Sequence, residues 1–137
     1  MTRALTLEQA EQIVAACKQE AESIGQPMNI AVVDEGANLV AFTSMDDTKL
    51  IGVDISQRKA LTAVYFQTDT IDLVPLVQPG AALYGIESTS EGKLVVFAGG
   101  VLLRDASGAI VGGVGVSAGT VDEDHQVAAA GRTAYTG

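Results

Sequence analysis

The residues best suited to chemistry gather in GVSAGTVDEDHQVA, residues 115–128, where a glycine-rich run meets a helix pattern. This stretch holds the only histidine, His125, three residues after Asp122, and residues three apart are neighbours on a helix. An Asp–His pair can orient and activate a serine, and Ser117 is close in sequence. The letters around Ser117 match G-x-S-x-G, but the helix pattern begins three residues after the serine instead of at it. A serine hydrolase is therefore disfavoured.

A phosphate cradle is also disfavoured at this junction. Thr120 and Glu123 form the Thr-x-x-Glu pattern of a capping box, in which side chains bond the free N–H groups of the helix start. Asp122 and Asp124 add negative charge where a phosphate would sit. These two carboxylates do not share one helical face with His125, and the sequence has neither His-x-x-x-His nor a cysteine pair. No metal site is predicted.

Arg58 and Lys59 form a second candidate group, on a predicted helix. A lysine that faces a pocket in an acidic protein could bind a carboxylate, or carry a proton after it loses its water. Asp46, between a predicted strand and this helix, could act as general base if it is buried. The alternative is a solvated helix face on which Arg58 pairs with Asp54, four residues earlier.

Glycines crowd the region before the last helix, and strands with interior glycines are normally weakened. Two explanations are open: bulges that curve the sheet, or close approach of a flat or bulky ligand to bare backbone. The residues concerned are Gly99, Gly100, Gly112, Gly113, Gly115 and Gly119.

Hydrophobic periodicity predicts the elements that position these groups, and in this sequence helices alternate with β-hairpins. A capping box at Thr6–Gln9 opens a helix that Gly25 and Pro27 end. The remaining predicted elements are a hairpin of strands 28–34 and 39–45, a helix from 46 to about 66, a short helix at 70–76, a loop, a hairpin of strands within 93–105 and 109–119, and a helix from 120 to about 135. This order predicts an α/β (α+β) fold in a single domain, 1–137, with one antiparallel sheet of two hairpins flanked by helices.

Composition limits the class of partner. The formal net charge of −9 argues against nucleic acid and anionic membranes, which require a basic face. We expect a cytoplasmic protein, because the chain has no long apolar run, no signal-peptide pattern, and one cysteine, Cys17, on the apolar stripe of the first helix. With 47% hydrophobic and only 18% charged residues, we also expect a homo-oligomer that covers apolar surface.

An ordered set of motifs spans roughly Leu5 to Gly131: LTLEQAEQIV, IAVVDEGANLVAF, MDD, KALTA, LVQPG with LYG, VFAGGVLLRD and GVGVSAGTVDEDHQVAAAG. Together they resemble the GlcG/HbpS-like family, whose fold also forms the C-terminal domain of PduO-type cobalamin adenosyltransferases. The resemblance implies a profilin-like arrangement of one antiparallel sheet with helices, assembled into dimers or rings up to octamers.

The resemblance implies several functions, among them haem binding or degradation and enzymatic action on small organic acids. Haem iron takes His, Met, Cys or Tyr as axial ligand. The first helix, where the haem-binding members would hold a ligand, offers only Cys17, so we expect weak or non-specific haem binding. His125, Tyr84 or Met45 would be the substitute ligands.

The favoured prediction is a small enzyme that acts on an unsaturated or hydroxylated organic acid by proton transfer, hydration or hydrolysis. Its catalytic residues would be Asp46, Lys59, Ser117 and His125, with Ser117 and N–H groups near Gly119 stabilising developing negative charge. The predicted ligand-binding residues are Arg58, Gln78, Pro79, Gly80, Tyr84, Gly99, Gly100, Gly119, Thr120 and Asp124. The alternatives are a haem- or corrinoid-binding protein and a non-catalytic assembly partner; no cofactor is certain, and haem is possible.

Overall fold

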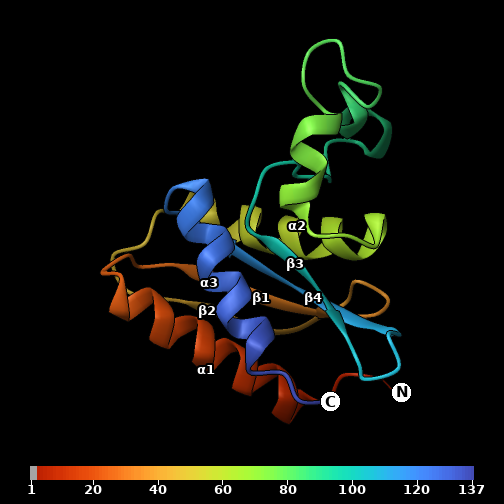
Figure 1. Ribbon diagram of the computed structural model, residues 1–137. Helices are drawn as coiled ribbons and strands as arrows, with labels where there is room; N and C mark the ends of the chain where they lie inside the picture. Colours follow the sequence, from red (N-terminus) through yellow and green to blue (C-terminus); the bar gives the residue numbers. More distant parts are fainter. Residues whose placement is uncertain (1–2) are drawn as a thin grey trace.

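The computed structural model describes residues 3–137 as a four-stranded sheet between two layers of helices. Figure 1 shows helix α2 (Ile51–Phe66) on one face of the sheet, with α1 (Leu7–Ser23) and α3 (Val121–Thr133) on the other. The strands are β1 (Asn29–Asp34), β2 (Leu39–Ser44), β3 (Gly100–Arg104) and β4 (Ile110–Ser117). The prediction of one antiparallel sheet flanked by helices is confirmed.

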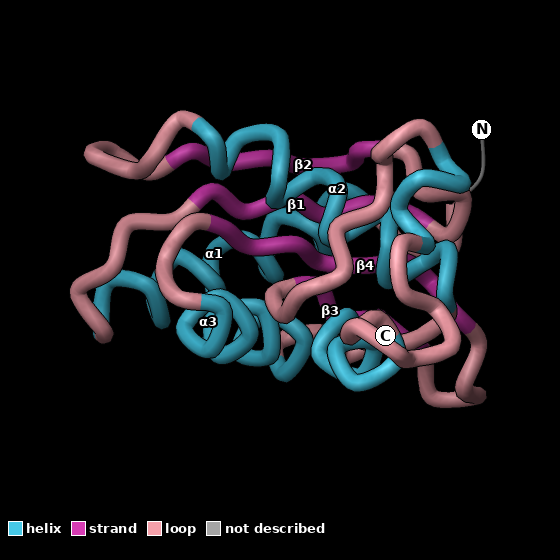
Figure 2. The backbone as a smooth tube through the Cα atoms, turned by 90° about the horizontal axis from the view of Figure 1, so that it is seen from above, coloured by secondary structure: helices cyan, strands magenta, loops and turns pink. Residues whose placement is uncertain are grey.

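The strands lie in the order β2-β1-β4-β3, which Figure 2 shows from above. The two strands of each hairpin pair with each other, β1 with β2 and β3 with β4. Strand β1 also pairs with β4 in antiparallel register, with Ala31 opposite Gly115. The two hairpins therefore form one sheet with β2 and β3 as its edges.

Two predicted capping boxes are confirmed. Thr6 and Gln9 bond reciprocally at the start of α1, and Thr120 and Glu123 do so at the start of α3. The Asp34 turn is also as expected, since its Oδ1 accepts from the N–H groups of Gly36 and Asn38 at 2.9 Å.

Two boundaries differ from the prediction, and one short segment was not predicted. Helix α2 begins at Ile51 instead of 46, because the Asn29 amide donates to Thr48 Oγ1 and Lys49 O and holds this segment as a loop. The run 93–105 is a strand only from Gly100. Between α2 and β3 the chain forms two 3₁₀ segments, Thr70–Leu76 as a predicted short helix and Ile86–Ser90 unpredicted, on an arm that projects from the body (Figure 1).

The main hydrophobic core lies between the sheet and the α1–α3 layer. It consists of side chains such as Ile13, Cys17, Ile30, Val114 and Val127, all fully buried. Within the described residues no helix is long and apolar enough to cross a membrane.

Candidate functional site

Lys59 and Asp124 form a buried ion pair where α2, β4 and α3 meet. The Lys59 ammonium donates to Asp124 Oδ2 at 2.7 Å and to the Val116 carbonyl at 2.8 Å. Their side chains are 0% and 3% exposed. Nζ also lies 5.1 Å from the centre of the Phe97 ring, within the range of a cation–π interaction.

Burial is the main influence on both charges of this pair. Burial lowers the pKa of Lys59, and the nearby charge of Asp124 partly offsets this decrease. Burial also raises the pKa of Asp124, and the charge of Lys59 partly offsets that increase. The second oxygen of Asp124 accepts the Gly119 N–H at 2.8 Å. The pair therefore ties together the end of β4, the start of α3 and the middle of α2.

Five of the predicted site residues lie at this junction: Lys59, Gly99, Ser117, Gly119 and Asp124. Ser117 is 3% exposed, and its carbonyl accepts from the Asn29 amide at 3.1 Å. The N–H groups near Gly119 were expected to stabilise charge on a ligand, but Gly119 N–H is taken by Asp124 and Thr120 N–H by Glu123. None of the three cavities described below is lined by these groups. The junction is built as a packed, mutually satisfied cluster.

Other predicted residues lie elsewhere. Asp46 is exposed, so the burial on which its role as base depended is absent, and it lines a cavity with Met45. Arg58 pairs with Asp54 at 2.7 Å on an exposed helix face, which is the alternative that the sequence left open. Gln78, Pro79, Gly80 and Tyr84 are exposed on the projecting arm, and Tyr84 is 66% exposed.

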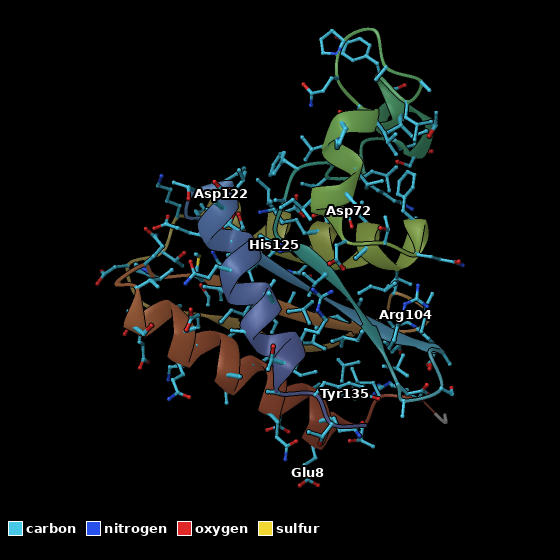
Figure 3. All side chains as sticks on the ribbon, in the orientation of Figure 1. Glu8, Asp72, Arg104, Asp122, His125 and Tyr135 are labelled. Carbon is cyan, nitrogen blue, oxygen red and sulfur yellow. The ribbon has the colours of Figure 1, made fainter. Side chains whose placement is uncertain are left out.

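His125 and Asp122 both belong to α3 (Figure 3), but no hydrogen bond joins them among the described residues. His125 Nδ1 is buried without a partner in that part of the chain. Thr120 serves as the N-cap of α3. The triad geometry considered for Ser117 is therefore not formed.

The glycines have a packing role that neither sequence explanation named. A Cβ on Gly100 would meet the Lys59 carbonyl, one on Gly115 would meet the Ser56 carbonyl, and one on Gly113 would lie 2.7 Å from the Ala60 carbonyl. The bare backbone of β3 and β4 is thus approached by a helix of the same chain, α2. Gly99 similarly leaves room for the Lys59 ammonium.

An apolar groove between α1 and the edge strand β2 is the feature that the sequence analysis missed. We call it the α1–β2 groove; it has a volume of about 430 Å³ and is lined by Leu7, Glu11, Val14, Ala15, Lys18, Val40, Ala41, Phe42 and Thr43. A second cavity of about 400 Å³, lined by Met45 and Asp46 among others, shares Lys18 and Thr43 with it. The available signal was LVAF at residues 39–42, an apolar run without alternation on a strand that has only one neighbour.

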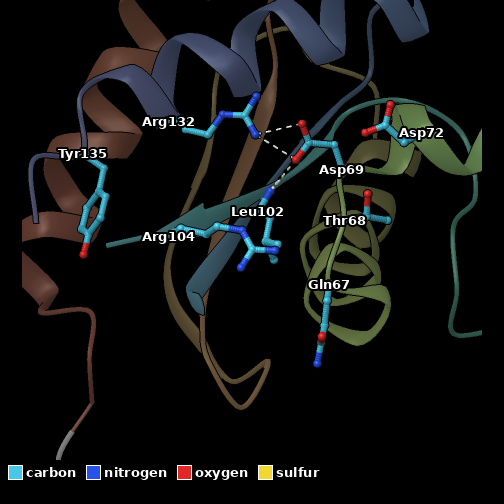
Figure 4. A pocket seen from close by; sticks show the side chains of 8 residues that line it. All are labelled: Gln67, Thr68, Asp69, Asp72, Leu102, Arg104, Arg132 and Tyr135. Atoms are coloured by element: carbon cyan, nitrogen blue, oxygen red, sulfur yellow. Dashed lines mark hydrogen bonds and ion pairs between the residues drawn. The ribbon is translucent and has the colours of Figure 1, made fainter. Parts of the chain in front are cut away.

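The third cavity lies at the opposite edge of the sheet, beside β3. It has a volume of about 340 Å³ and a polar lining of Gln67, Thr68, Asp69, Asp72, Leu102, Arg104, Arg132 and Tyr135 (Figure 4). None of these residues was predicted as part of a site.

Comparison with known proteins places the chain in a family. Residues 5–133 match the family model described as "Haem degrading protein HbpS-like". Protein GlcG of Escherichia coli K12 is 36% identical over 113 residues, covering 82% of this chain and 81% of GlcG. The corrinoid adenosyltransferase PduO of Citrobacter freundii is 38% identical over 124 residues, which are 90% of this chain but only 37% of PduO.

A solved structure agrees. The crystal structure of the PduOC:heme complex superposes with a TM-score of 0.91 at 36% sequence identity, covering 96% of this chain and 94% of that one. The matched family model and these relatives together show that the chain belongs to the HbpS-like family.

Proposed function

We propose that this chain binds haem, and that the macrocycle occupies the α1–β2 groove. One observation carries the placement: of the three cavities compared above, this is the one with a mainly apolar wall. Two comparisons support haem as the ligand class: the matching family is described as haem-degrading, and a similar solved structure is a PduOC:heme complex. A cofactor pocket is typically concave and apolar with few polar groups, and 430 Å³ falls within the usual range of about 300–1,000 Å³.

The groove offers both apolar contact and a cation. Leu7, Val14 and Ala15 line it from α1, and Val40, Ala41 and Phe42 from β2, so a flat macrocycle would be held by burial of its faces. Lys18 lies at the boundary with the adjoining cavity, 4.0 Å from Glu22 on an exposed surface. Its ammonium could pair with a haem carboxylate.

Met45 is a soft iron ligand that lines the cavity adjoining the groove. No His, Met, Cys or Tyr lines the groove itself, whereas Met45 lines the adjoining cavity, and its sulfur accepts the Met28 N–H at 3.4 Å. Burial raises the pKa of Cys17 to about 12, and its sulfur faces Gly131, so the thiolate form needed for iron ligation is disfavoured. Tyr84 and His125 line none of the three cavities. Of the three substitute ligands proposed from sequence, Met45 is the one next to the groove.

Haem bound there would supply a redox-active iron. The residues of this chain would provide the apolar walls, the cation and one nearby sulfur. We expect modest affinity, because burial of apolar surface would supply most of the binding free energy and no His, Met, Cys or Tyr lines the groove to bind the iron.

The organic-acid enzyme preferred from sequence is not supported. The comparisons favour haem, and the proposed catalytic residues are separated. Asp46 is exposed beside β2, whereas Lys59 is buried between α2 and the sheet and is already bonded to Asp124. We therefore replace that reading with haem binding.

A matched pair of variants on one helix tests the placement. Ala15→Glu puts a charge inside the groove, and Gln12→Glu puts the same charge on an exposed position of α1 that does not line it. When haem titration is followed at the Soret band, we expect Ala15→Glu to raise Kd at least about tenfold. Position 15 is exposed in the free protein, and a bound macrocycle would cover the new carboxylate, which costs more than about 1.4 kcal/mol. Gln12→Glu should bind like the parent protein. Equal Kd values for all three proteins would contradict the groove as the site.

A further inference from the structure

The β3-edge cavity of Figure 4 is lined by Arg104, which forms no ion pair with a carboxylate among residues 3–137. Arg3, Arg58 and Arg132 each lie within 4.0 Å of an aspartate oxygen, whereas Arg104 forms no ion pair with any described residue. Acidic groups outnumber basic ones by 17 to 8, so most arginines find a carboxylate. Arg104 instead donates from Nη1 to the Gly108 carbonyl at 2.9 Å, and its other donors have no partner among residues 3–137.

The neighbouring charges are already used. Arg132 Nη1 donates to both oxygens of Asp69 at 2.8 Å, and Asp69 Oδ1 also accepts the Leu102 N–H at 2.9 Å. The two charges of this pair neutralise each other, and the pair fixes the wall of the cavity. The Nε and Nη2 donors of Arg132 form no hydrogen bond with the described residues. Asp72, on the rim, is the remaining carboxylate of the lining.

Neutral polar and apolar groups complete the lining. Figure 4 shows the Arg104 guanidinium between Tyr135 on one side and Gln67 and Thr68 on the other. Burial, with the charge of Asp105, raises the pKa of Tyr135, so its phenol remains a neutral donor at neutral pH. The ring of Tyr135 and the side chain of Leu102 give the cavity an apolar side.

We propose that this cavity is a binding site for a small organic carboxylate, held by the Arg104 guanidinium with Arg132 beside it. A guanidinium presents parallel N–H groups that match a carboxylate in a bidentate fork. A doubly charged phosphate fits less well, because Asp72 on the rim and the net charge of −9 repel the second charge more strongly. The cavity lies at the β3 edge, opposite the α1–β2 groove, so it is a site separate from the proposed haem site.

The test is an NMR titration that follows the arginine Nε–H signals of the full chain. Sodium acetate and sodium benzoate serve as carboxylate probes, with inorganic phosphate and chloride at equal ionic strength. We expect saturable shifts of the Arg104 and Arg132 signals with either carboxylate and weaker binding of phosphate. Arg104→Gln should weaken carboxylate binding at least tenfold. Arg58→Gln, an equal loss of charge at a position that does not line the cavity, should leave it unchanged.

Three results would overturn the proposal: shifts that do not saturate, phosphate that binds more tightly than the carboxylates, or Arg104→Gln with the affinity of the parent protein. Melting temperatures of both variants show whether the fold is kept. Haem titration of Arg104→Gln should give the parent Kd, so failure of this site and failure of the haem site are separate outcomes.

Discussion

Lys59 and Asp124 illustrate how a residue that looks catalytic in a sequence becomes structural in a fold. Each charge has lost its water, and each is compensated by the other and by backbone groups, Val116 O for the ammonium and Gly119 N–H for the carboxylate. Removing one partner of such a pair leaves an uncompensated buried charge, which typically costs about 3–5 kcal/mol. The pair therefore contributes to holding α2, β4 and α3 in place.

A double-mutant cycle checks this role. We expect Lys59→Met and Asp124→Leu each to lower the free energy of unfolding by about 3–5 kcal/mol, because each strands the other charge. The double variant should be more stable than either single variant, since no buried charge remains. Urea unfolding followed by circular dichroism measures all four proteins, and additive losses would contradict the buried-pair account.

Cys17 gives a second prediction at this scale. An unperturbed thiol with a pKa of 9.0 is half thiolate at pH 9, whereas a pKa of about 12 leaves about one thiol in a thousand ionised. Labelling of the native protein by a thiol reagent at pH 9 should therefore be slow, and addition of urea should make it fast. Rapid labelling of the native protein would show that Cys17 is accessible.

At the scale of elements, the sheet and α2 pack through backbone instead of side chains. The strands β3 and β4 present glycines to α2, which in turn presents small buried residues such as Ser56 and Ala60. The opposite face of the same sheet carries the valines and isoleucine of the main core. These strand positions are therefore glycine because the backbone of α2 lies too close for a Cβ atom.

Substitution of one such glycine tests the close approach. Gly115→Ala would force its Cβ against the Ser56 carbonyl on α2, so we expect a loss of stability well above 1–2 kcal/mol. Gly85→Ala is the control, because it has open space and only a left-handed φ of 82°, which costs about 1–2 kcal/mol. Thermal unfolding compares the two, and equal losses would contradict tight helix–sheet packing at Gly115.

Periodicity and capping residues were sufficient to predict the helices α1 and α3 and both hairpins, because these depend on local patterns. The order of these elements then predicted one antiparallel sheet flanked by helices. The start of α2 was misplaced because Asn29, far earlier in the chain, holds residues 48 and 49 outside the helix. Lys59 and Asp124 were both proposed as site residues, but their pairing across 65 positions has no local signature. The α1–β2 groove was missed for the same reason, since its two walls come from separate elements.

At the scale of the whole molecule, large apolar side chains remain on the surface. Leu50 is 86% exposed, Ile51 60% and Tyr84 66%. Exposed apolar side chains on a chain with few charged residues favour self-association, and the family resemblance also implies a homo-oligomer. We expect light scattering at micromolar concentration to give a mass of at least two chains. A mass near 14.1 kDa at every concentration would contradict this prediction.

Haem binding in the α1–β2 groove is the central claim, and amide line broadening by paramagnetic ferric haem tests it most directly. We expect signals of Val14, Ala15, Ala41 and Phe42 to broaden first as haem is added to ¹⁵N-labelled protein. Zinc protoporphyrin, which is diamagnetic, should shift the same signals without broadening them. Signals of Tyr84 and His125 should remain sharp. Broadening centred on either of those residues, or spread evenly over the surface, would contradict the account.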